Sequence, residues 1–379
     1  MRKKILLYYP PNKRSVAIET LCRAVKDAGH ELVILTLTEK DSFHQQMEIM
    51  GFATFTTVMD RKPSWKYFLN QARYLIRFCK EHKIDSVWSH LQEANIIATL
   101  AQRFMNAKVV TFRHHAESAF YAEYGQQFGM QRNKNEVRFD KIINRLSKTI
   151  VVPSSGVWYA MEKYEACDMR KVKLLPYIYD FTSYQQPDQE KIQKLKEHYS
   201  CRLLLIMVSR MVNSKQHQPV FEVLKELIEE GLSIKLIVMD DGPLRPELEA
   251  FIKINQLEEY ILLVGFQKDF INYMAVSDLL IHPSLTEASN NVTKEMGLLE
   301  KTVAVCRDVG DFNDYIYDQQ NGYLMDRSVI KSEIKRVVLD AYHHPENLIK
   351  MGKNLKQDVL NKFNDSPVNR KGFIELAGL

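Results

Sequence analysis

Two glutamates eight residues apart, Glu287 and Glu295, stand on either side of a short polar stretch that could begin a helix. The N–H groups at a helix N-terminus bind anions, and an ionised carboxylate accepts several hydrogen bonds, which suits it to a vicinal diol. Upstream, Arg210 and Lys215 add two cations, and a guanidinium can bind phosphate oxygens bidentately. This combination of groups indicates a site for a nucleotide diphosphate that carries a sugar.

Each residue of this candidate donor site has an expected role. Arg210 and Lys215 would neutralise the diphosphate. Glu295 would hold the ribose, and Glu287 would accept a hydrogen bond from the sugar. The remaining donor-binding candidates are the turn at Asp241 and Gly242, where glycine permits a special backbone conformation or a close approach to a ligand, the N–H groups near Ser289, Asn290 and Asn291, and Phe266.

All of these candidates follow a predicted strand or lie in the helix that begins there. Short apolar runs alternate with longer amphipathic stretches, a pattern typical of parallel strands joined by crossover helices. The carboxyl ends of parallel strands share one edge of a sheet, so the loops that follow them should bring the candidates together. The expected strands span residues 3–9, 31–37, 86–89, 108–112, 149–152, 202–209, 233–239, 260–265, 278–283 and 301–306.

A polar stretch with a proline, residues 180–188, interrupts the alternation and indicates a linker. The expected fold class is therefore α/β, with two Rossmann-like domains at residues 1–182 and 183–360. Ligands in such sheets bind beyond the carboxyl ends of the strands, so we expect the active site in the cleft between the two domains.

The composition of the 379-residue chain, 45% hydrophobic and 26% charged, is typical of a globular protein. Its five cysteines are odd in number and lack metal-ligand spacing, so we expect reduced thiols, a cytoplasmic location and no metal site. The N-terminal apolar run is shorter than the roughly 7–15 residues of a signal-peptide core, and no run approaches the roughly 18 of a membrane span. A formal charge of +5 does not demand a nucleic-acid partner.

Together, the motifs resemble those of the retaining glycosyltransferases of the GT-B fold, in the large family-four group (glycosyl transferases group 1). The signature of that family is a Glu-x7-Glu motif, whose spacing Glu287 and Glu295 match. Its Arg-x4-Lys phosphate clamp matches Arg210 and Lys215. Its Gly-Pro-Leu-Arg turn, DVGG stretch and NGxL stretch resemble residues 242–245, 308–310 and 321–323.

The resemblance implies an enzyme that moves a sugar from a nucleotide-diphosphate-sugar donor to a hydroxyl of a glycan or lipid-linked acceptor, with retention of anomeric configuration. Polysaccharide or surface-glycan assembly in bacteria is the usual setting of such enzymes. The resemblance also implies two facing domains, the first on the acceptor side and the second for the donor. A last helix within residues 361–379 would cross back to the first domain.

The resemblance further implies a histidine after the strand at 108–112, near the transferred sugar and the acceptor. His114 and His115 both stand there. Neighbouring side chains on an extended segment point in opposite directions, so both cannot face the ligand equally, and we expect His114 rather than His115 in this role. Arg113 could also reach the phosphates. The catalytic candidates are therefore His114, His115 and Glu287.

The sequence departs from the family pattern at several positions. Residues 10–15, after the first strand, contain no glycine, whereas the family has a glycine-rich loop there. The other departures are Tyr177-Ile178 in place of Asn-Gly, Asn290-Asn291 in place of Gly-Leu or Gly-Ile, Glu300 at a usual glycine and Thr302 at a usual proline. We therefore expect sugar contacts that differ from those of well-known members.

No Asp-x-Asp pair stands at the end of a predicted strand. The charge of the leaving diphosphate would then be stabilised by Arg210, Lys215 and helix amides rather than by a metal ion. We expect a metal-independent enzyme with no cofactor besides its nucleotide-sugar substrate.

Residues 61–83 form an unusually basic predicted helix, with seven Lys and Arg residues against one acidic residue. It has a basic stripe and an expected apolar stripe of Trp65, Phe68, Leu69, Ala72, Leu75, Ile76 and Cys79. One interpretation is a half-buried helix with a solvated basic face. The other is an anionic-membrane patch that brings the enzyme, peripherally, to a lipid-linked acceptor.

Three other functions fit parts of the pattern. A bilobal solute-binding protein also has two α/β lobes, but it would need an export signal and no Glu-Arg-Lys set. A non-catalytic, nucleotide-sugar-binding relic of the same fold would retain the site without turnover. A sugar-nucleotide epimerase on a related fold is the third.

Overall fold

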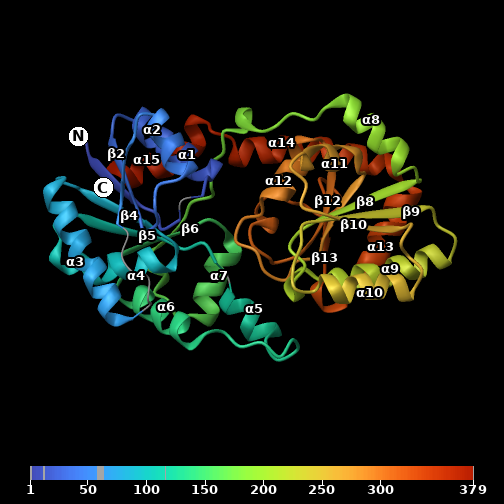
Figure 1. The fold of residues 1–379 in the computed structure, drawn as a ribbon, viewed down its shortest axis with the longest axis horizontal. Helices are drawn as coiled ribbons and strands as arrows, with labels where there is room; N and C mark the ends of the chain where they lie inside the picture. The colour runs from blue at the N-terminus through green and yellow to red at the C-terminus, as the bar shows by residue number, and fades with distance from the viewer. Residues whose placement is uncertain (1, 12, 58–63, 116, 379) are drawn as a thin grey trace. The chain divides into compact units, whose positions relative to one another are not determined.

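The computed structural model describes residues 2–11, 13–57, 64–115 and 117–378, and these fall into two compact units. Unit 1 comprises residues 1–182 and 363–379, and unit 2 comprises residues 183–362. Each unit is a parallel β-sheet with helices on both faces (Figure 1). The division falls in the polar stretch at residues 180–188, which contains the short 3₁₀ helix η3 (Phe181–Ser183).

In the described part of unit 1, seven parallel strands are ordered β3-β2-β1-β4-β5-β6-β7. β1 is an interior strand, with Leu6 opposite Val33 of β2 on one side and Val87 of β4 on the other. Its run of apolar residues suits a strand that is covered on both faces. The strands are β1 (Lys4–Tyr8), β2 (Glu31–Thr36), β3 (Ala53–Thr56), β4 (Ser86–His90), β5 (Lys108–Phe112), β6 (Thr149–Val152) and β7 (Val172–Leu174).

Two groups of helices cover the two faces of this sheet (Figure 1): α1, α2 and α15 bury apolar side chains on one face, and α3, α4 and α6 on the other. Phe373 of α15 packs in the same cluster as Ile18 of α1, so the last helix belongs to unit 1. The helices are α1 (Val16–Asp27), α2 (Ser42–Ile49), α3 (Trp65–Glu81), α4 (Leu91–Ala101), η1 (Gln102–Phe104), α5 (Glu117–Tyr124), α6 (Lys134–Leu146), α7 (Ser155–Tyr164), η2 (Met169–Lys171) and α15 (Pro367–Gly378).

Helix α3 makes up most of the basic segment; residues 61–63 of that segment lie outside the described residues. The prediction that Trp65 and Leu69 join the apolar stripe is wrong, because they are 53% and 46% exposed. Leu69 lies three residues after Lys66 and four before Arg73, so helical periodicity places it on the basic, solvent-facing side. The buried stripe consists of Tyr67, Phe68, Gln71, Ala72, Leu75, Phe78 and Cys79.

In unit 2, six parallel strands of the described chain are ordered β10-β9-β8-β11-β12-β13. Central β8 has the sequence LLLIMV, which again suits a strand covered on both faces. The strands are β8 (Leu203–Val208), β9 (Ile234–Met239), β10 (Ile261–Gly265), β11 (Leu279–His282), β12 (Thr302–Cys306) and β13 (Tyr323–Met325).

Helices α9, α10 and α13 bury their apolar faces in one core of unit 2, while α12 packs against α14, where Gly297 meets Leu355 and Val359. The helices are α8 (Gln189–His198), η4 (Asn213–Lys215), α9 (His217–Glu229), α10 (Arg245–Ile254), α11 (Phe270–Val276), α12 (Asn291–Leu298), η5 (Phe312–Asp314), η6 (Arg327–Val329), α13 (Ile330–His343) and α14 (Pro345–Phe363).

The strand order of each sheet reverses at one point: between β1 and β4 in unit 1, and between β8 and β11 in unit 2. At such a switch point the connections after two neighbouring strands leave in opposite directions, and ligands bind in the crevice that this opens at the carboxyl edge. In unit 2 the two loops concerned are residues 209–216 and 283–290. These loops contain the two predicted cations and the first predicted glutamate.

Candidate active site

The loop after β8 carries the two cations predicted to bind phosphate. Arg210 follows the strand and is exposed, whereas Lys215 ends η4 and is half-buried. Gln216 then adopts a left-handed conformation, with φ of 54°, and begins α9 as its N-cap. The loop therefore presents both cations at the carboxyl edge of the sheet, at its switch point.

Backbone hydrogen bonds join this loop to the turn after β9. Met211 N donates to Asp241 O at 3.0 Å, and Leu244 N donates to Met211 O at 3.1 Å. A Cβ on Gly242 would lie 2.4 Å from Met211 O, so glycine is required here by the approach of another loop's backbone. The left-handed residue of the turn is not Gly242 but Asp240, with φ of 84°. The prediction of a special backbone conformation at Gly242 is thus wrong. The close approach that requires glycine is made by the backbone of another loop of the protein.

A partly buried ion pair joins the β8 loop to the loop after β11. Lys215 Nζ donates to Glu287 Oε1 and, at 3.1 Å, to Ser284 Oγ, while His282 Nε2 lies 2.7 Å from the same Glu287 oxygen. Burial alone would raise the pKa of Glu287, but His282 and Lys215 lower it to about 2. Burial lowers the pKa of His282. Glu287 is therefore a firmly ionised carboxylate beside the cation of Lys215.

The polar stretch between the two glutamates ends in the N-cap of α12. Asn290 Oδ1 accepts from Thr293 N at 3.0 Å, and Asn290 N donates to Asp311 Oδ1 at 3.3 Å. The Ser289 hydroxyl donates to Asp311 Oδ2 at 2.6 Å. Asn291 is the exposed first residue of the helix. The Ser289 side chain and the N–H groups of Asn290 and Thr293 are thus engaged by protein groups, which constrains how this helix end could bind an anion.

Glu295 lies one turn into α12 and is half-buried. Burial raises the pKa of this carboxyl to about 7, and the charge of Lys294 opposes the rise. Tyr184, in the segment before α8, lies close enough for Glu295 to raise the pKa of its phenol, although burial has the larger effect. Glu295 therefore changes charge near neutral pH, unlike Glu287.

The last two predicted donor-binding residues occupy the loops after β9 and β10. Asp241 is exposed; its Oδ1 accepts from Gly242 N at 2.7 Å, and its Oδ2 lies 3.6 Å from Arg245. Phe266 directly follows β10 and is 76% exposed. An aromatic ring exposed at the carboxyl edge offers a flat surface on which a nucleobase could stack.

Sequence reasoning missed a buried ion pair beneath this site. Lys294 Nζ lies 2.6 Å from Asp311 Oδ2, and each side chain is only 1% exposed. A signal was present: Asp311 stands where the family stretch DVGG has its second glycine, and Lys294 directly precedes Glu295. His282, which contacts Glu287 and Asn290, was also missed; it is the last residue of an apolar strand.

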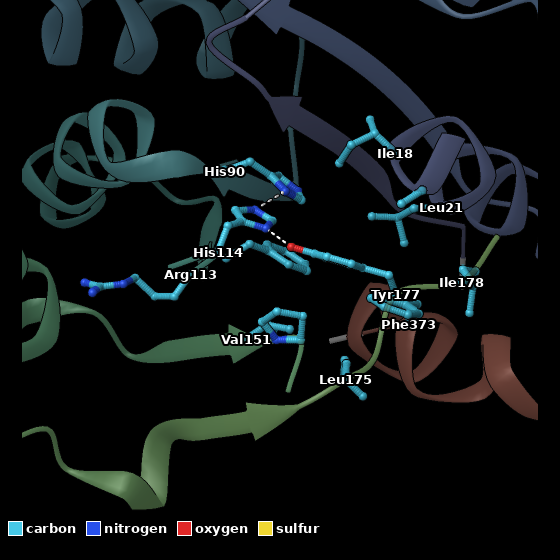
Figure 2. A pocket seen from close by; sticks show the side chains of 13 residues that line it. Ile18, Leu21, His90, Arg113, His114, Val151, Leu175, Tyr177, Ile178 and Phe373 are labelled. Atoms are coloured by element: carbon cyan, nitrogen blue, oxygen red, sulfur yellow. Dashed lines mark hydrogen bonds between the residues drawn. The ribbon is translucent and has the colours of Figure 1, made fainter. Parts of the chain in front are cut away.

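In unit 1, the predicted catalytic histidine His114 is held between two side chains (Figure 2). His114 Nε2 lies 3.0 Å from His90 Nδ1 at the end of β4, and His114 Nδ1 is hydrogen-bonded to the Tyr177 hydroxyl. Burial lowers the pKa of His114 to about 3 and that of His90 well below its ordinary value. Both imidazoles are therefore neutral, and both nitrogens of His114 are occupied within the protein.

His114 also lines a cavity of about 200 Å³ whose wall consists mostly of polar side chains. His115, which is exposed, also lines it. The cavity lies beyond the carboxyl ends of β4 and β5, where a parallel sheet binds its ligands. Its other lining residues are Leu91, Gln92, Asn95, Arg113, Glu117, Arg132, Glu136 and Asp140.

The suggestion that Arg113 reaches phosphates is not supported by its position. Its side chain is 5% exposed and leads away from His114 (Figure 2). Arg113 Nη1 donates to Asp140 at 2.7 Å, and Nη2 donates to both oxygens of Glu165 at 3.0 Å. Two buried carboxylates compensate this guanidinium, so it stabilises the packing of α6 and α7 beneath the cavity.

The loop after β1, where the family has glycines, carries the charged side chain of Arg14 in this protein. Residue 12 lies outside the described residues. Arg14 binds Glu19 of α1 bidentately, with both nitrogen–oxygen distances 2.9 Å. A guanidinium therefore stands near the switch point of unit 1, where a glycine-rich loop would offer backbone N–H groups.

Among the described residues, no group of three or more His, Cys, Asp or Glu side chains is arranged to hold a metal ion. None of the helices in the described part of the chain has the length and apolar character that a membrane crossing requires. The predicted donor-binding residues at the carboxyl edge of unit 2 include the cations Arg210 and Lys215 and two carboxylates of unlike pKa, Glu287 and Glu295, beside the N-terminus of α12. Such a set can bind a polar ligand that carries both phosphates and hydroxyls.

Both halves of the chain match protein-family models. Residues 15–180 match the model described as Glycosyltransferase Family 4, and residues 188–358 match Glycosyl transferases group 1. An alpha-monoglucosyldiacylglycerol synthase of Acholeplasma laidlawii is 21% identical over 355 residues, 89% of this chain and 86% of that protein. A Campylobacter jejuni N-acetylgalactosaminyltransferase that acts on a diphospho-undecaprenol saccharide is 25% identical over 241 residues, 61% of this chain and 60% of that protein.

Solved structures share the fold over nearly the whole chain. HepE of Anabaena in complex with UDP superposes with a TM-score of 0.79 at 17% identity, over 99% of this chain and all of that one. TarM, a Staphylococcus aureus protein, has a TM-score of 0.76 at 11% identity, over 100% of this chain and 99% of that one.

Proposed function

This chain belongs to the GT-B glycosyltransferases, and on that premise we propose that it transfers a sugar from a nucleotide-diphosphate-sugar donor to an acceptor hydroxyl with retention of anomeric configuration. The observation that carries the proposal is the Lys215–Glu287 ion pair at the switch point of unit 2, with Arg210 on the same loop. A cation, a carboxylate and a second cation are held there at the edge where such sheets bind ligands.

In the donor complex, Arg210 and Lys215 bind the diphosphate and stabilise the charge that develops as it leaves. Glu287, ionised beside Lys215, accepts hydrogen bonds from hydroxyls of the sugar. Glu295 accepts from the ribose hydroxyls, and its carboxylate form binds them more strongly than the protonated form because both oxygens then accept and the hydrogen bonds are charge-assisted. Phe266 stacks on the base, and the turn at Asp241 and Gly242 borders the site.

The acceptor binds in unit 1, in the cavity of about 200 Å³ beside His114 and His115. Its polar wall suits a saccharide unit with several hydroxyls. His114 is neutral and its nitrogens are engaged, so we assign it the role of an orienting group. It does not act as a general acid, because its pKa of about 3 leaves it without a proton to give at neutral pH.

The acceptor proton has a nearby base in the leaving diphosphate, as the resemblance to retaining family members implies. The protein's task is then to hold the two substrates and to stabilise the departing charge through Arg210, Lys215 and the α12 amides. We propose that no metal ion is required. Turnover that EDTA abolishes and Mg²⁺ or Mn²⁺ restores would overturn this part.

A further proposal concerns the exposed face of α3. Lys66, Leu69, Arg73, Arg77 and Lys80 lie on it, so cations surround an exposed apolar side chain. Such a face suits the surface of an anionic membrane. The relatives named for diacylglycerol and diphospho-undecaprenol products support a lipid-linked acceptor. The cytoplasmic location inferred from the cysteines stays a prediction.

The test of the proposed function is turnover. A panel of nucleotide sugars, with UDP-glucose first because HepE was also solved with it, is incubated with lipid-linked saccharide and diacylglycerol acceptors. Release of nucleoside diphosphate that depends on an acceptor is the expected result, and NMR of the product should show the donor's anomeric configuration. Binding of donors without turnover by any acceptor would favour the non-catalytic relic, and inversion would refute the retaining mechanism.

A further inference from the structure

The buried Lys294–Asp311 pair contacts Ser289 and Asn290, two of the residues near which N–H groups are predicted to bind phosphate. Lys294 belongs to α12, but its side chain runs back to the N-terminus of that helix. Its Nζ donates to Asn290 O at 2.8 Å and to Ser289 Oγ at 3.1 Å, besides the ion pair with Asp311 at 2.6 Å. Three oxygens therefore surround one buried ammonium.

Asp311 binds the same two residues from the other side. Its Oδ2 accepts from the Ser289 hydroxyl at 2.6 Å, and its Oδ1 accepts from Asn290 N at 3.3 Å. Ser289 and Asn290 are thus each bound by both members of the pair. From Asn290 the network continues, since its Nδ2 lies 3.2 Å from His282 Nε2 and His282 contacts Glu287.

A contribution to fold stability alone does not explain why a buried ion pair stands at this position. Removing two charges from water costs several kcal/mol per ion, and well-packed apolar residues often replace such pairs without loss of stability. The placement is also specific. Lys294 immediately precedes Glu295, and it is the charged group that opposes the rise in the pKa of Glu295 caused by burial. Tyr184, in the segment before α8, also interacts electrostatically with Glu295.

We propose that Lys294 is a positioning residue of the donor site: its buried ammonium, neutralised by Asp311, fixes Ser289 and Asn290 at the N-terminus of α12 and keeps Glu295 available as a carboxylate for the ribose. This inference rests on the proposed function, because it assigns Lys294 to the same donor site. It predicts that the charge of Lys294, and not only its packing, governs how nucleotide binding depends on pH.

The experiment measures the dissociation constant of a nucleoside diphosphate by calorimetry between pH 5.5 and 9, in the presence of EDTA. UDP, GDP, ADP and CDP are compared on the wild type, and the tightest becomes the probe. For the wild type, affinity should increase as Glu295 ionises near pH 7. Glu295→Gln should lack this step, which assigns it to that carboxyl.

Lys294→Met should move the step upward by about one pH unit, since removal of a nearby positive charge disfavours a carboxylate. Binding at pH 7 should then weaken by about fivefold, because the ionised fraction of Glu295 falls from about one half to about one tenth. Lys294→Arg keeps the charge and should keep the step near pH 7. Because Lys294→Met leaves Asp311 buried without a counter-ion, the double variant Lys294→Met/Asp311→Leu provides an alternative without a buried unpaired charge. Its shift should have the same direction and be smaller, because one charge of each sign is removed.

The outcomes separate the two proposals. If no nucleotide binds the wild type, the proposed function fails. If a nucleotide binds and the step stays at the same pH in both Lys294→Met and the double variant, the inference about Lys294 fails while the proposed function stands. A fall in melting temperature with an unmoved pH profile would show that the pair only maintains the fold.

Discussion

Lys215 and Glu287 are bonded to each other across the switch point of unit 2: the ammonium of one, on the loop after β8, donates to the carboxylate of the other, on the loop after β11. In the proposed complex the first binds a phosphate and the second binds the sugar. The pair thus brings together two groups that act on opposite sides of the bond to be broken, and it holds both loops in place.

Replacing Lys215 with Met should reduce kcat/KM for the nucleotide sugar by about 10²–10³, the usual cost of removing one group that stabilises developing negative charge. Glu287 would also lose the lysine ammonium that forms an ion pair with it. Steady-state kinetics of nucleotide release measure the effect. The matched control is Lys225→Met, which removes an exposed pair with Glu229 on α9 and should change kcat/KM less than twofold. Similar rates for both variants would contradict the assignment.

Glu295 should make the stability of the protein depend on pH around neutrality. Its pKa is about 7 in the folded protein and about 4.5 when exposed, so the folded state binds the extra proton between these values. The contribution of Glu295 to the free energy of unfolding is largest below about pH 4.5. It is lost as the pH rises through 7, and the free energy of unfolding then falls by at most about 3 kcal/mol.

Glu295→Gln removes this loss. The melting temperature of the variant relative to the wild type should therefore increase from pH 5 to pH 8, measured without nucleotide. Glu249→Gln, on the exposed side of α10, serves as the control and should show no such trend. A constant difference for Glu295→Gln across this range would show that the carboxyl is not destabilised by burial.

His114 should not titrate in the range where the enzyme works, because its pKa is about 3. His114→Gln should therefore lower kcat/KM without changing the shape of its profile between pH 5.5 and 8. Tyr177→Phe removes the hydroxyl that contacts His114 Nδ1 and should reproduce part of the loss. A wild-type ionisation near pH 6.5 that vanishes in His114→Gln would contradict the neutral, orienting role.

The face of α3 should determine binding to anionic vesicles. Arg73→Glu/Arg77→Glu should abolish co-sedimentation with phosphatidylglycerol vesicles while leaving the melting temperature within a few degrees, since both side chains are exposed. Lys350→Glu/Lys353→Glu changes the net charge equally on exposed positions of α14 and should leave sedimentation unchanged. Equal loss in both double variants, or equal wild-type binding to neutral vesicles, would rule out a specific patch.

The fold was predictable because its signals are local. The apolar runs of β1 and β8 and the polar stretch at 180–188 are visible in single windows of the sequence. Parallel strands then require that Arg210, Lys215 and Glu287 reach one edge, whatever the details of their side chains. Their order along the chain was sufficient to place them.

Side-chain partners were not predictable in this way. Lys294 finds Asp311 seventeen residues later, and His114 finds Tyr177 sixty-three residues later. Only tertiary packing brings such groups together, and a short window of the sequence gives no information about tertiary packing. Leu69 was misplaced for a related reason: an apolar residue on a helix was assigned to the buried face, although its position relative to Lys66 and Arg73 places it outside.

Departures from the family pattern had local physical consequences. Glu300, at a usual glycine, adopts a left-handed conformation with φ of 58°, which glycine accepts without strain. The carboxylate of Glu300 also forms an ion pair with Lys356, at a distance of 2.9 Å. Tyr177, at a usual asparagine, supplies the hydroxyl that contacts His114. The backbone pattern of the family is thus retained here with different side chains.

The most direct test of the central claim, a metal-independent nucleotide-diphosphate site at Arg210 and Lys215, is a thermal-shift comparison of UDP, GDP, ADP and CDP in EDTA on the wild type, Arg210→Ala and Arg202→Ala. Arg202 lies near the opposite end of β8 and provides the matched control. One nucleotide at 100 times its Kd should stabilise the wild type and Arg202→Ala by about 2.7 kcal/mol and Arg210→Ala by much less. An equal shift in Arg210→Ala, or no shift of the wild type with any of the four, would contradict the account.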